Sequence, residues 1–175
     1  MLDIETLGTT PDCVIVTFGA VKFDPYSLRE PTDGIYMRLD ADEQIARGRK
    51  VDEDTLQWWM TQPDVVREEA IGEGDRWDIE SFIQVLNKFL VGVDAIWAQG
   101  PSFDMVILEN LYRQYGYPQP WLYYQIRDSR TLFKVHGDPR VAGREGHHNA
   151  LADCVYQAQG VQQIYNRFGI KKYPD

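Results

Sequence analysis

The sequence has 175 residues, of which 43% are hydrophobic, so we expect one sizeable core and a single domain over residues 1–175. Its 27 acidic residues outnumber the 18 lysines and arginines, which gives a formal net charge of −9. Proteins that coat long stretches of nucleic acid need a basic surface, so this balance argues against that class. It does not argue against an enzyme that binds only the end of one nucleic-acid strand.

The sequence also argues against a membrane or secreted protein. No apolar run approaches the roughly 18 residues that cross a bilayer, and the N-terminus lacks the pattern of a signal peptide. Cys13 and Cys154 lie far apart, without the spacing of a zinc site, and are expected to be reduced and packed in the core. We therefore expect a cytoplasmic protein, in a bacterium or a phage-infected cell.

The first strand is predicted in the opening segment MLDIETLGTT (1–10), which carries two carboxylates, Asp3 and Glu5. Side chains alternate between the faces of a strand, so Asp3 and Glu5 share one face while Leu2 and Ile4 point into a core. Like charges side by side repel unless a cation lies between them. An exposed edge strand with two ordinary acids is one interpretation. The other is half of a divalent-metal site, with the oxygen ligands that Mg²⁺ or Mn²⁺ prefers.

Two further strands are predicted next, in CVIVTFGAVKF (13–23), which is rich in β-branched and aromatic residues, and in GIYMRL (34–39), which alternates. Turn signals at 24–25 and 31–34 favour an antiparallel meander. The basic run ARGRK (46–50) is expected to be a solvated turn.

Helical patterns dominate the remainder. One helix is predicted to begin at the N-cap Asp52 and to stop before Pro63. A second helix is expected in DIESFIQVLNKFL. A short buried strand at 94–100 follows it, and another helix comes directly after that strand. Two more helices are expected in RDSRTLFKVHG and from about Asn149 to Phe168. Strands first, followed by alternating helix and strand, predict an α/β sheet with an antiparallel portion and flanking helices.

Further acids lie where they can complete the site. Asp104 follows the strand at 94–100 as a helix begins, a place where ligands collect in open α/β sheets, although an Asp in the first turn is also commonly a cap. Asp153 lies in the last helix, and His148 precedes it by five residues, in the loop before that helix. His147 is the alternative histidine, one residue further away.

These segments resemble the three sequence motifs of the DEDDh 3'–5' exonucleases, in the ribonuclease H-like superfamily. The matching segments are LDIETLGT (2–9), WAQGPSFDMVIL (97–108) and HNALADC (148–154), and the His148–Asp153 spacing fits the branch that uses histidine. TLQWWMTQ and RDSRTL are also similar to small phage and bacterial members, including exonuclease VIII-like and mycobacterial exoribonuclease-like proteins.

The resemblance implies a mixed five-stranded sheet, with three early antiparallel and two later parallel strands, flanked by helices. It implies hydrolysis at 3' ends of single-stranded DNA or RNA, or of short oligonucleotides, with two Mg²⁺ or Mn²⁺ ions. His148 would be the general base, because a histidine's ordinary pKa of about 6.5 suits that role, and Glu5 is the other catalytic residue. The expected metal ligands are Asp3, Glu5, Asp104 and Asp153. A homodimer is compatible with this family.

Substrate-binding residues are also expected. Thr6, Leu7 and Gly8 resemble the segment that receives the terminal nucleotide, although an ordinary turn explains them equally well. Phe103 is expected to stack on a base or to pack in the core.

Arg144, Trp58 and Trp59 have two interpretations each, and Asp128 has one. Arg144, in a glycine-rich loop with Arg140, is expected to clamp a phosphate, against the alternative of a solvated loop. Trp58 and Trp59 cannot share one helix face, so one is buried and the other lines a groove, unless both pack in the core. Asp128 is assigned to structural pairing with a nearby arginine.

Rival functions and one departure from the family remain. An endonuclease of the same fold would need a broad basic face, and a binding or assembly module would not need the full set of five site residues. Only Met1 and Leu2 precede Asp3, whereas relatives have a longer apolar segment there. A strand this short at its start is expected to fray and to weaken metal binding.

Overall fold

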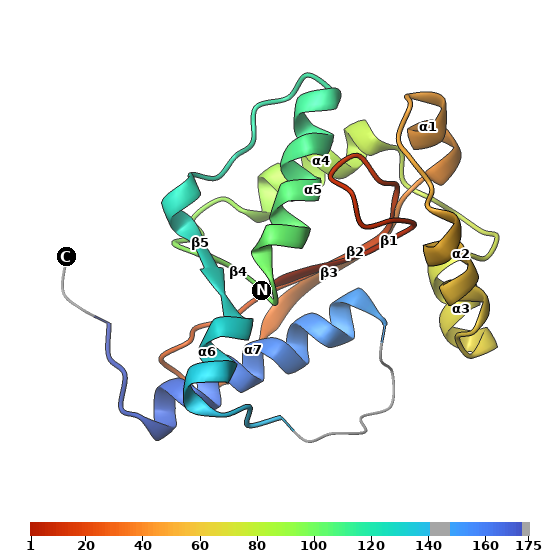
Figure 1. Cartoon of the computed structure of the whole chain (residues 1–175). Coiled ribbons are helices and arrows are strands. Elements are labelled where there is room, and N and C mark those ends of the chain that lie inside the picture. Colours follow the sequence, from red (N-terminus) through yellow and green to blue (C-terminus); the bar gives the residue numbers. More distant parts are fainter. Residues whose placement is uncertain (141–147, 173–175) are drawn as a thin grey trace.

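The structure is a computed structural model that describes residues 1–140 and 148–172. In these residues it forms five strands and seven α-helices, which build an α/β fold (Figure 1). The strands are β1 (Leu2–Thr6), β2 (Ile15–Lys22), β3 (Thr32–Arg38), β4 (Ile96–Ala98) and β5 (Ile126–Asp128). The helices are α1 (Ala41–Ala46), α2 (Glu53–Met60), α3 (Asp64–Ile71), α4 (Ile79–Phe89), α5 (Pro101–Gln114), α6 (Ser129–His136) and α7 (Ala150–Arg167).

The strands follow the predicted pattern of three early antiparallel strands and two later parallel ones. β1, β2 and β3 form an antiparallel meander, in which Asp3 pairs with Gly19 and Glu5 with Thr17. β4 and β5 pair in parallel, with Ile96 opposite Ile126. β1 also contacts β4, so the two hydrogen-bonded sheets lie next to each other. The predicted α/β fold class is confirmed.

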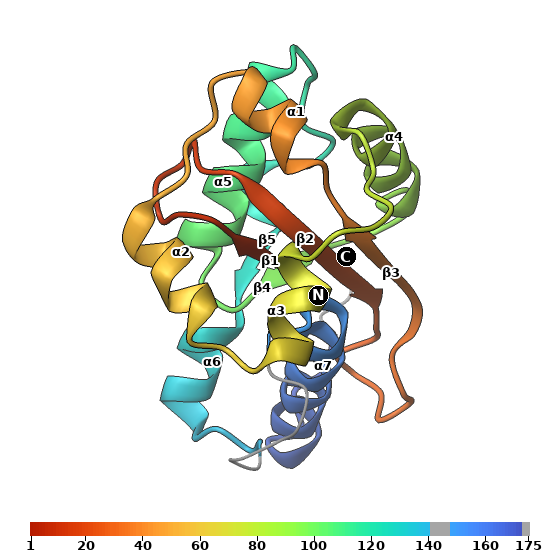
Figure 2. The ribbon, with the colours of Figure 1, turned by 90° about the vertical axis from the view of Figure 1, so that its right-hand side faces the viewer.

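Helices cover both faces of the meander, with α4 and α5 on one side and α7 on the other (Figures 1 and 2). The first side holds the largest core cluster, which includes Leu2 and Ile4 from β1 together with Phe18, Phe82 and Leu108. The prediction that Leu2 and Ile4 point into a core is therefore confirmed. Asp3 and Glu5 project to the opposite side, toward α7.

Gly19 allows α7 to lie unusually close to β2. A side chain at Gly19 would place its Cβ 2.3 Å from the backbone carbon of Ala150 and from the nitrogen of Leu151. Cys154 also donates its Sγ–H to the carbonyl oxygen of Gly19 at 3.3 Å. Because Gly19 pairs with Asp3, this contact places the first turn of α7 beside the acidic face of β1.

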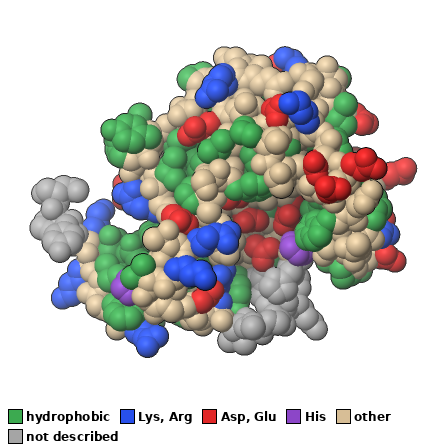
Figure 3. All heavy atoms as spheres, in the orientation of Figure 1, with side chains coloured by type: hydrophobic (Ala, Val, Ile, Leu, Met, Phe, Trp, Pro, Cys, Tyr) green, Lys and Arg blue, Asp and Glu red, His purple; other side chains and the backbone are tan. Residues whose placement is uncertain are grey.

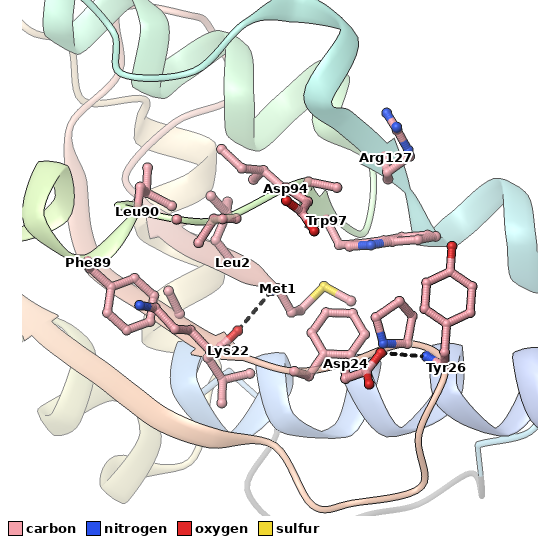
Figure 4. A pocket seen from close by; sticks show the side chains of 18 of the residues that line it. Met1, Leu2, Lys22, Asp24, Tyr26, Phe89, Leu90, Asp94, Trp97 and Arg127 are labelled. Atoms are coloured by element: carbon pink, nitrogen blue, oxygen red, sulfur yellow. Dashed lines mark hydrogen bonds between the residues drawn. The ribbon is translucent and has the colours of Figure 1, made fainter. Parts of the chain in front are cut away.

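The start of β1 is tied into the ladder. The terminal amine of Met1 donates to the carbonyl oxygen of Val21 at 2.9 Å, and the Val21 N–H donates back to Met1 at 2.9 Å. Met1 also borders a cavity of about 670 Å³ that Trp97 and Tyr26 line (Figure 4). None of the predicted site residues in the described ranges lines that cavity, and Asp3 follows a residue that is already paired.

The structure confirms the helices predicted from caps and periodicity. Asp52 caps α2 by accepting from the Thr55 N–H, and Asn149 caps α7 in the same way. None of the helices in the described parts of the chain is long and apolar enough to cross a membrane. Cys13 and Cys154 are both buried and unpaired, as predicted.

One smaller prediction was wrong at a single residue, because residues 46, 47, 48 and 50 of the basic run are exposed as expected, and a second prediction was wrong. Arg49, in the run expected to be a solvated turn, is only 3% exposed, and its guanidinium donates to the Cys13 carbonyl oxygen and to Asn110. Within residues 1–140 and 148–172, Asp128 has no arginine side chain as an ion-pair partner; it caps α6, accepting from the backbone N–H of Arg130 and from the Thr131 hydroxyl. For Arg49 a buried hydrogen-bond network replaces the expected exposed charge, and for Asp128 a helix cap replaces the expected ion pair.

We predict that Gly19→Ala destabilises the protein strongly, because the added methyl group would overlap the backbone of α7 rather than a movable side chain. Overpacking of this kind lowers Tm by about 10 °C in a chain of this size. Thermal unfolding followed by circular dichroism measures the change.

Gly92→Ala is the matched control, since Gly92 has φ 76 and nothing lies within 4 Å of its hypothetical Cβ. It carries backbone strain without a clash, so its loss of Tm is expected to be smaller. Equal losses for the two variants would show that α7 does not depend on close approach at Gly19.

Candidate functional site

Three acids from β1 and α7 converge on one side of the meander. Asp3 and Glu5 project from β1, and Asp153 reaches them from the first turn of α7. One carboxylate oxygen from each lies within 4.8 Å of the others. Gln157, one turn after Asp153, donates its amide N–H to Asp3 Oδ1 at 3.3 Å. The sequence-predicted acids of the first and third motifs are therefore brought together.

Asp104 joins the same cleft from the first turn of α5. Its side chain is 4% exposed, and Oδ1 accepts from the backbone N–H of Ile4 at 3.3 Å, so it ties α5 to β1. The N-cap of α5 is Gly100, at φ 108, which leaves Asp104 outside the role of a cap. The cleft has a volume of about 650 Å³, and Figure 3 shows acidic side chains gathered in a hollow on this face.

His148 lies at the mouth of the cleft, beside the acids. Its Nδ1 is 3.8 Å from Glu5 Oε1, and its backbone N–H donates to Asp153 Oδ2 at 3.0 Å. The backbone at His148 has φ 66, in the left-handed region that non-glycine residues seldom adopt. Such a conformation persists where surrounding contacts hold it, and here it turns the imidazole toward Glu5.

Burial and mutual repulsion disfavour ionisation of these acids. Burial, with the charges of Asp104, Glu5 and Asp153, raises the pKa of Asp3 well above its ordinary value. Burial and the charges of Asp153 and Asp104 raise the pKa of Glu5 to about 8. Burial raises the pKa of Asp104 to about 6. The acids of the cleft therefore cannot all be ionised at neutral pH unless a cation offsets their charge.

The residues present fit a divalent cation. Carboxylate oxygens are the ligands that Mg²⁺ and Mn²⁺ prefer, and three of them already lie within reach of one ion. The Oε1 atom of Gln157 is buried at the same place, without a hydrogen-bond partner in the described residues. Asp3, Glu5 and Asp153 would be the protein ligands of an ion there, with Asp104 at the side of the cleft nearest α5.

The other predicted substrate-binding residues are distributed differently. Phe103 packs against the main core, as one of its two interpretations predicted, and it also lines the cleft. Its stacking on a base stays a prediction. Thr6, Leu7 and Gly8 are buried and do not line the cleft; the Thr6 hydroxyl donates to the Gly8 carbonyl oxygen at 2.7 Å. Their part in substrate binding stays a prediction. Arg144 lies outside the described residues, as does the alternative histidine, His147.

Several cleft residues were not predicted as part of the site. Gln99 directly follows β4, and Arg130 lies in the first turn of α6. Tyr156 and Gln157 lie on the same stretch of α7 as Asp153. Helical spacing was a usable signal for Gln157, which is four residues after Asp153 and therefore on the same face. No local pattern indicated Gln99 or Arg130, because only the tertiary fold brings them to the acids.

The motifs and this cleft indicate a 3'–5' exonuclease, and comparison with known families supports that class. A model of the family described as the 3'-5' exoribonuclease Rv2179c-like domain matches residues 1–165. Since the match covers nearly all of the 175 residues, the chain belongs to the 3'-5' exoribonuclease Rv2179c-like domain family. No curated protein shows significant similarity to the chain. The closer likeness to exonuclease VIII-like proteins stays a prediction.

We predict that Glu5→Gln stabilises the metal-free protein at alkaline pH. The pKa of Glu5 is about 8 in the folded state against an ordinary 4.5, so the folded protein holds this proton more tightly than the unfolded chain does. The wild type therefore loses stability as pH rises from 4.5 toward 8, and a glutamine avoids that loss. In EDTA at pH 8 we expect Tm to be at least about 3 °C higher for the variant.

Added Mn²⁺ should reverse this order, because the ion offsets the repulsion only where the carboxylate is present. Glu30→Gln is the control, since Glu30 is an exposed acid away from the cleft. A variant that is no more stable than the wild type in EDTA at pH 8 would contradict the account of buried repulsion.

Proposed function

We propose that this chain is a metal-dependent 3'–5' exoribonuclease of the DEDDh type. The observation that carries the proposal is the convergence of three carboxylates within 4.8 Å, with His148 beside Glu5. Family membership supports the exonuclease activity, and the family's description favours RNA. The reaction would be hydrolysis of the last phosphodiester bond at a single-stranded 3' end or in a short oligonucleotide.

Two divalent ions, Mg²⁺ or Mn²⁺, would supply charge neutralisation of the phosphodiester and a lowered pKa for water. The chain's own residues divide the remaining work. Asp3, Glu5, Asp104 and Asp153 would provide the negative charge and the oxygen ligands that hold the divalent ions. His148 is held within 3.8 Å of Glu5 and partly exposed at the mouth, where it would accept the proton of the attacking water.

The acidic surface supports a short contact with substrate. With a formal net charge of −9, the chain has little attraction for long nucleic acid, but a strand end needs only a few local contacts. The negative net charge supports our proposal that the protein acts on free strand ends or on fragments, in the cytoplasm. Experiments also have to decide whether the protein hydrolyses DNA and whether it forms a homodimer.

A binding or assembly module is the competing function. Buried like charges reduce stability, and here they raise the pKa values of Asp3 and Glu5. A binding module has no function for such acids, whereas an enzyme uses them to bind metal ions. The presence of Asp3, Glu5, Asp104, Asp153 and His148 in one cleft therefore favours the enzyme.

The direct test uses two 5'-labelled single-stranded oligonucleotides of one sequence, RNA and DNA, incubated with Mg²⁺ or Mn²⁺. We expect products that shorten by one nucleotide at a time, faster for RNA, and that disappear with EDTA. His148→Ala should lower the rate by about 100-fold or more, as expected when a general base is lost. Denaturing gel electrophoresis measures the products.

An intact label with bound metal would favour the binding module, and a faster DNA ladder would revise the substrate. Internal cleavage products from the first time points would indicate an endonuclease instead.

Two tryptophans of α2 hold His148 in place. The Trp58 ring lies edge-to-face against the imidazole, with centroids 5.0 Å apart, and the Trp59 ring lies 6.3 Å away. Trp59 is fully buried and donates its Nε1–H to the Thr6 carbonyl oxygen at 2.9 Å, whereas Trp58 is 40% exposed. One tryptophan is therefore buried and the other is partly exposed beside His148, and α2 links the end of β1 to His148.

We predict that Trp58 is a positioning residue for His148. Trp58→Leu removes the aromatic contact and should lower kcat by about 10-fold, with a smaller change in KM, because the base is no longer held near Glu5. Trp58→Phe keeps a ring and should recover most of the activity. Trp77→Leu, at another exposed tryptophan, is the control. Loss of activity through KM alone, or no rescue by phenylalanine, would assign Trp58 to substrate contact instead.

A further inference from the structure

Two arginines line the cleft together with its acids, which include Asp138, the salt-bridge partner of Arg140. Arg130, in the first turn of α6, and Arg140, just after that helix, border the same cavity as Asp3, Glu5 and Asp104. Among the described residues that line it, these two carry the permanent positive charges. In Figure 3, Lys and Arg side chains lie at the edge of the hollow that holds the acids. A chain with a net charge of −9 thus places two cations beside its most acidic site.

Arg140 is held rigidly. Its Nε and Nη2 donate to the two carboxylate oxygens of Asp138, at 2.9 and 2.7 Å, and its Nη1 donates to Gln99 Oε1. The guanidinium also lies over the Phe133 ring, 4.3 Å from the centroid. These contacts use three of the five N–H groups of an arginine. They fix the guanidinium plane before any ligand arrives, which lowers the entropy cost of binding an anion.

Arg130 is placed next to it through the same residue. Its Nη2 donates to the backbone carbonyl oxygen of Gln99 at 2.8 Å, so Gln99 contacts both guanidinium groups. Gly100 makes room for Arg130, because a Cβ there would lie 3.3 Å from its Nε and Nη2. Arg130 is exposed, and its charge acts on Asp104. Gln99, at the end of β4, therefore sets two positive groups side by side at the edge of the acidic cleft.

We propose that Arg130 and Arg140 form a phosphate-binding subsite for the retained strand of the substrate. It would hold the backbone phosphate one nucleotide to the 5' side of the bond that is hydrolysed. Two like charges held together attract an anion, just as the neighbouring acids attract cations, and guanidinium groups match phosphate oxygens in geometry. This inference rests on the proposed exonuclease function, since it assigns the scissile phosphate to the carboxylates.

The subsite sets the direction in which the strand lies in the cleft. The carboxylates take the terminal nucleotide's phosphate with divalent ions, and the arginines take the next phosphate without them. Contact with one further phosphate suits an enzyme that binds a short segment, because each added phosphate contact increases both affinity and its dependence on salt. The substrate class is therefore a strand with at least one negatively charged linkage beyond the scissile bond.

The test combines arginine variants with a neutral linkage in the substrate. One 5'-labelled RNA carries a single 2'-deoxy methylphosphonate linkage next to the scissile bond on its 5' side, and the matched RNA carries a 2'-deoxy phosphate there. Initial rates of first-nucleotide removal give kcat/KM for the wild type, Arg130→Ala and Arg140→Ala. Arg127→Ala, on β5 away from the cleft, is the control variant.

We expect the neutral linkage to lower wild-type kcat/KM by about 10- to 100-fold, mainly through KM, as for loss of a charge-assisted hydrogen bond. Each cleft variant should lose a similar factor on the phosphate substrate and little more on the neutral one. The control should behave as the wild type. Arg130→Lys keeps the charge without the fork, so it should lie between the wild type and Arg130→Ala.

Additive losses, with each variant and the neutral linkage acting independently, would overturn the subsite while leaving the exonuclease intact. No hydrolysis by the wild type would overturn the proposed function and this inference with it. Unchanged Tm and unchanged Mn²⁺ binding in the variants show that any loss is not one of folding or of metal binding.

Discussion

The close packing of α7 on β2 decides where the functional groups of this protein meet. Gly19 lets the backbone of Ala150 and Leu151 occupy space that a side chain would fill, and Gly19 pairs with Asp3 in the neighbouring strand. The first turn of α7 therefore brings Asp153 against the acidic face of β1. Burial and repulsion there raise the pKa values of Asp3 and Glu5, a cost that bound cations would remove.

The rest of the cleft is organised around that concentration of negative charge. α5 adds Asp104, which also ties that helix to β1, and α2 holds His148 through Trp58. The first turn of α6 and the segment after that helix contribute Arg130 and Arg140, and both arginines donate hydrogen bonds to Gln99. A cleft that holds both a cluster of acids and two arginines suits a substrate whose phosphates are bound in two ways. A negatively charged protein can therefore act on negatively charged nucleic acid, because the attractive groups are needed only where one strand end binds.

Local sequence patterns predicted the strands and the capped helices, but not every element. Alternation in LDIET gave the correct faces for Leu2 and Glu5, and Asp52 marked the true start of α2. α1 and α3 were not predicted because they are short and have few apolar residues at helical spacing. The convergence of residues 3, 104 and 153 came from the family motifs, since no periodicity relates positions so far apart. The buried guanidinium of Arg49 and the pairing of Arg130 with Gln99 depend on partners from distant segments, which local sequence does not indicate.

The most direct test of the central claim is anomalous X-ray diffraction from crystals of the protein soaked in Mn²⁺. The account predicts anomalous density peaks between the carboxylates of Asp3, Glu5 and Asp153, and the loss of those peaks in Asp153→Asn crystals. Peaks confined to other surfaces, or an empty cleft with the acids in the same positions, would contradict it. That result would mean that the buried carboxylates are stabilised by shared protons rather than by divalent ions.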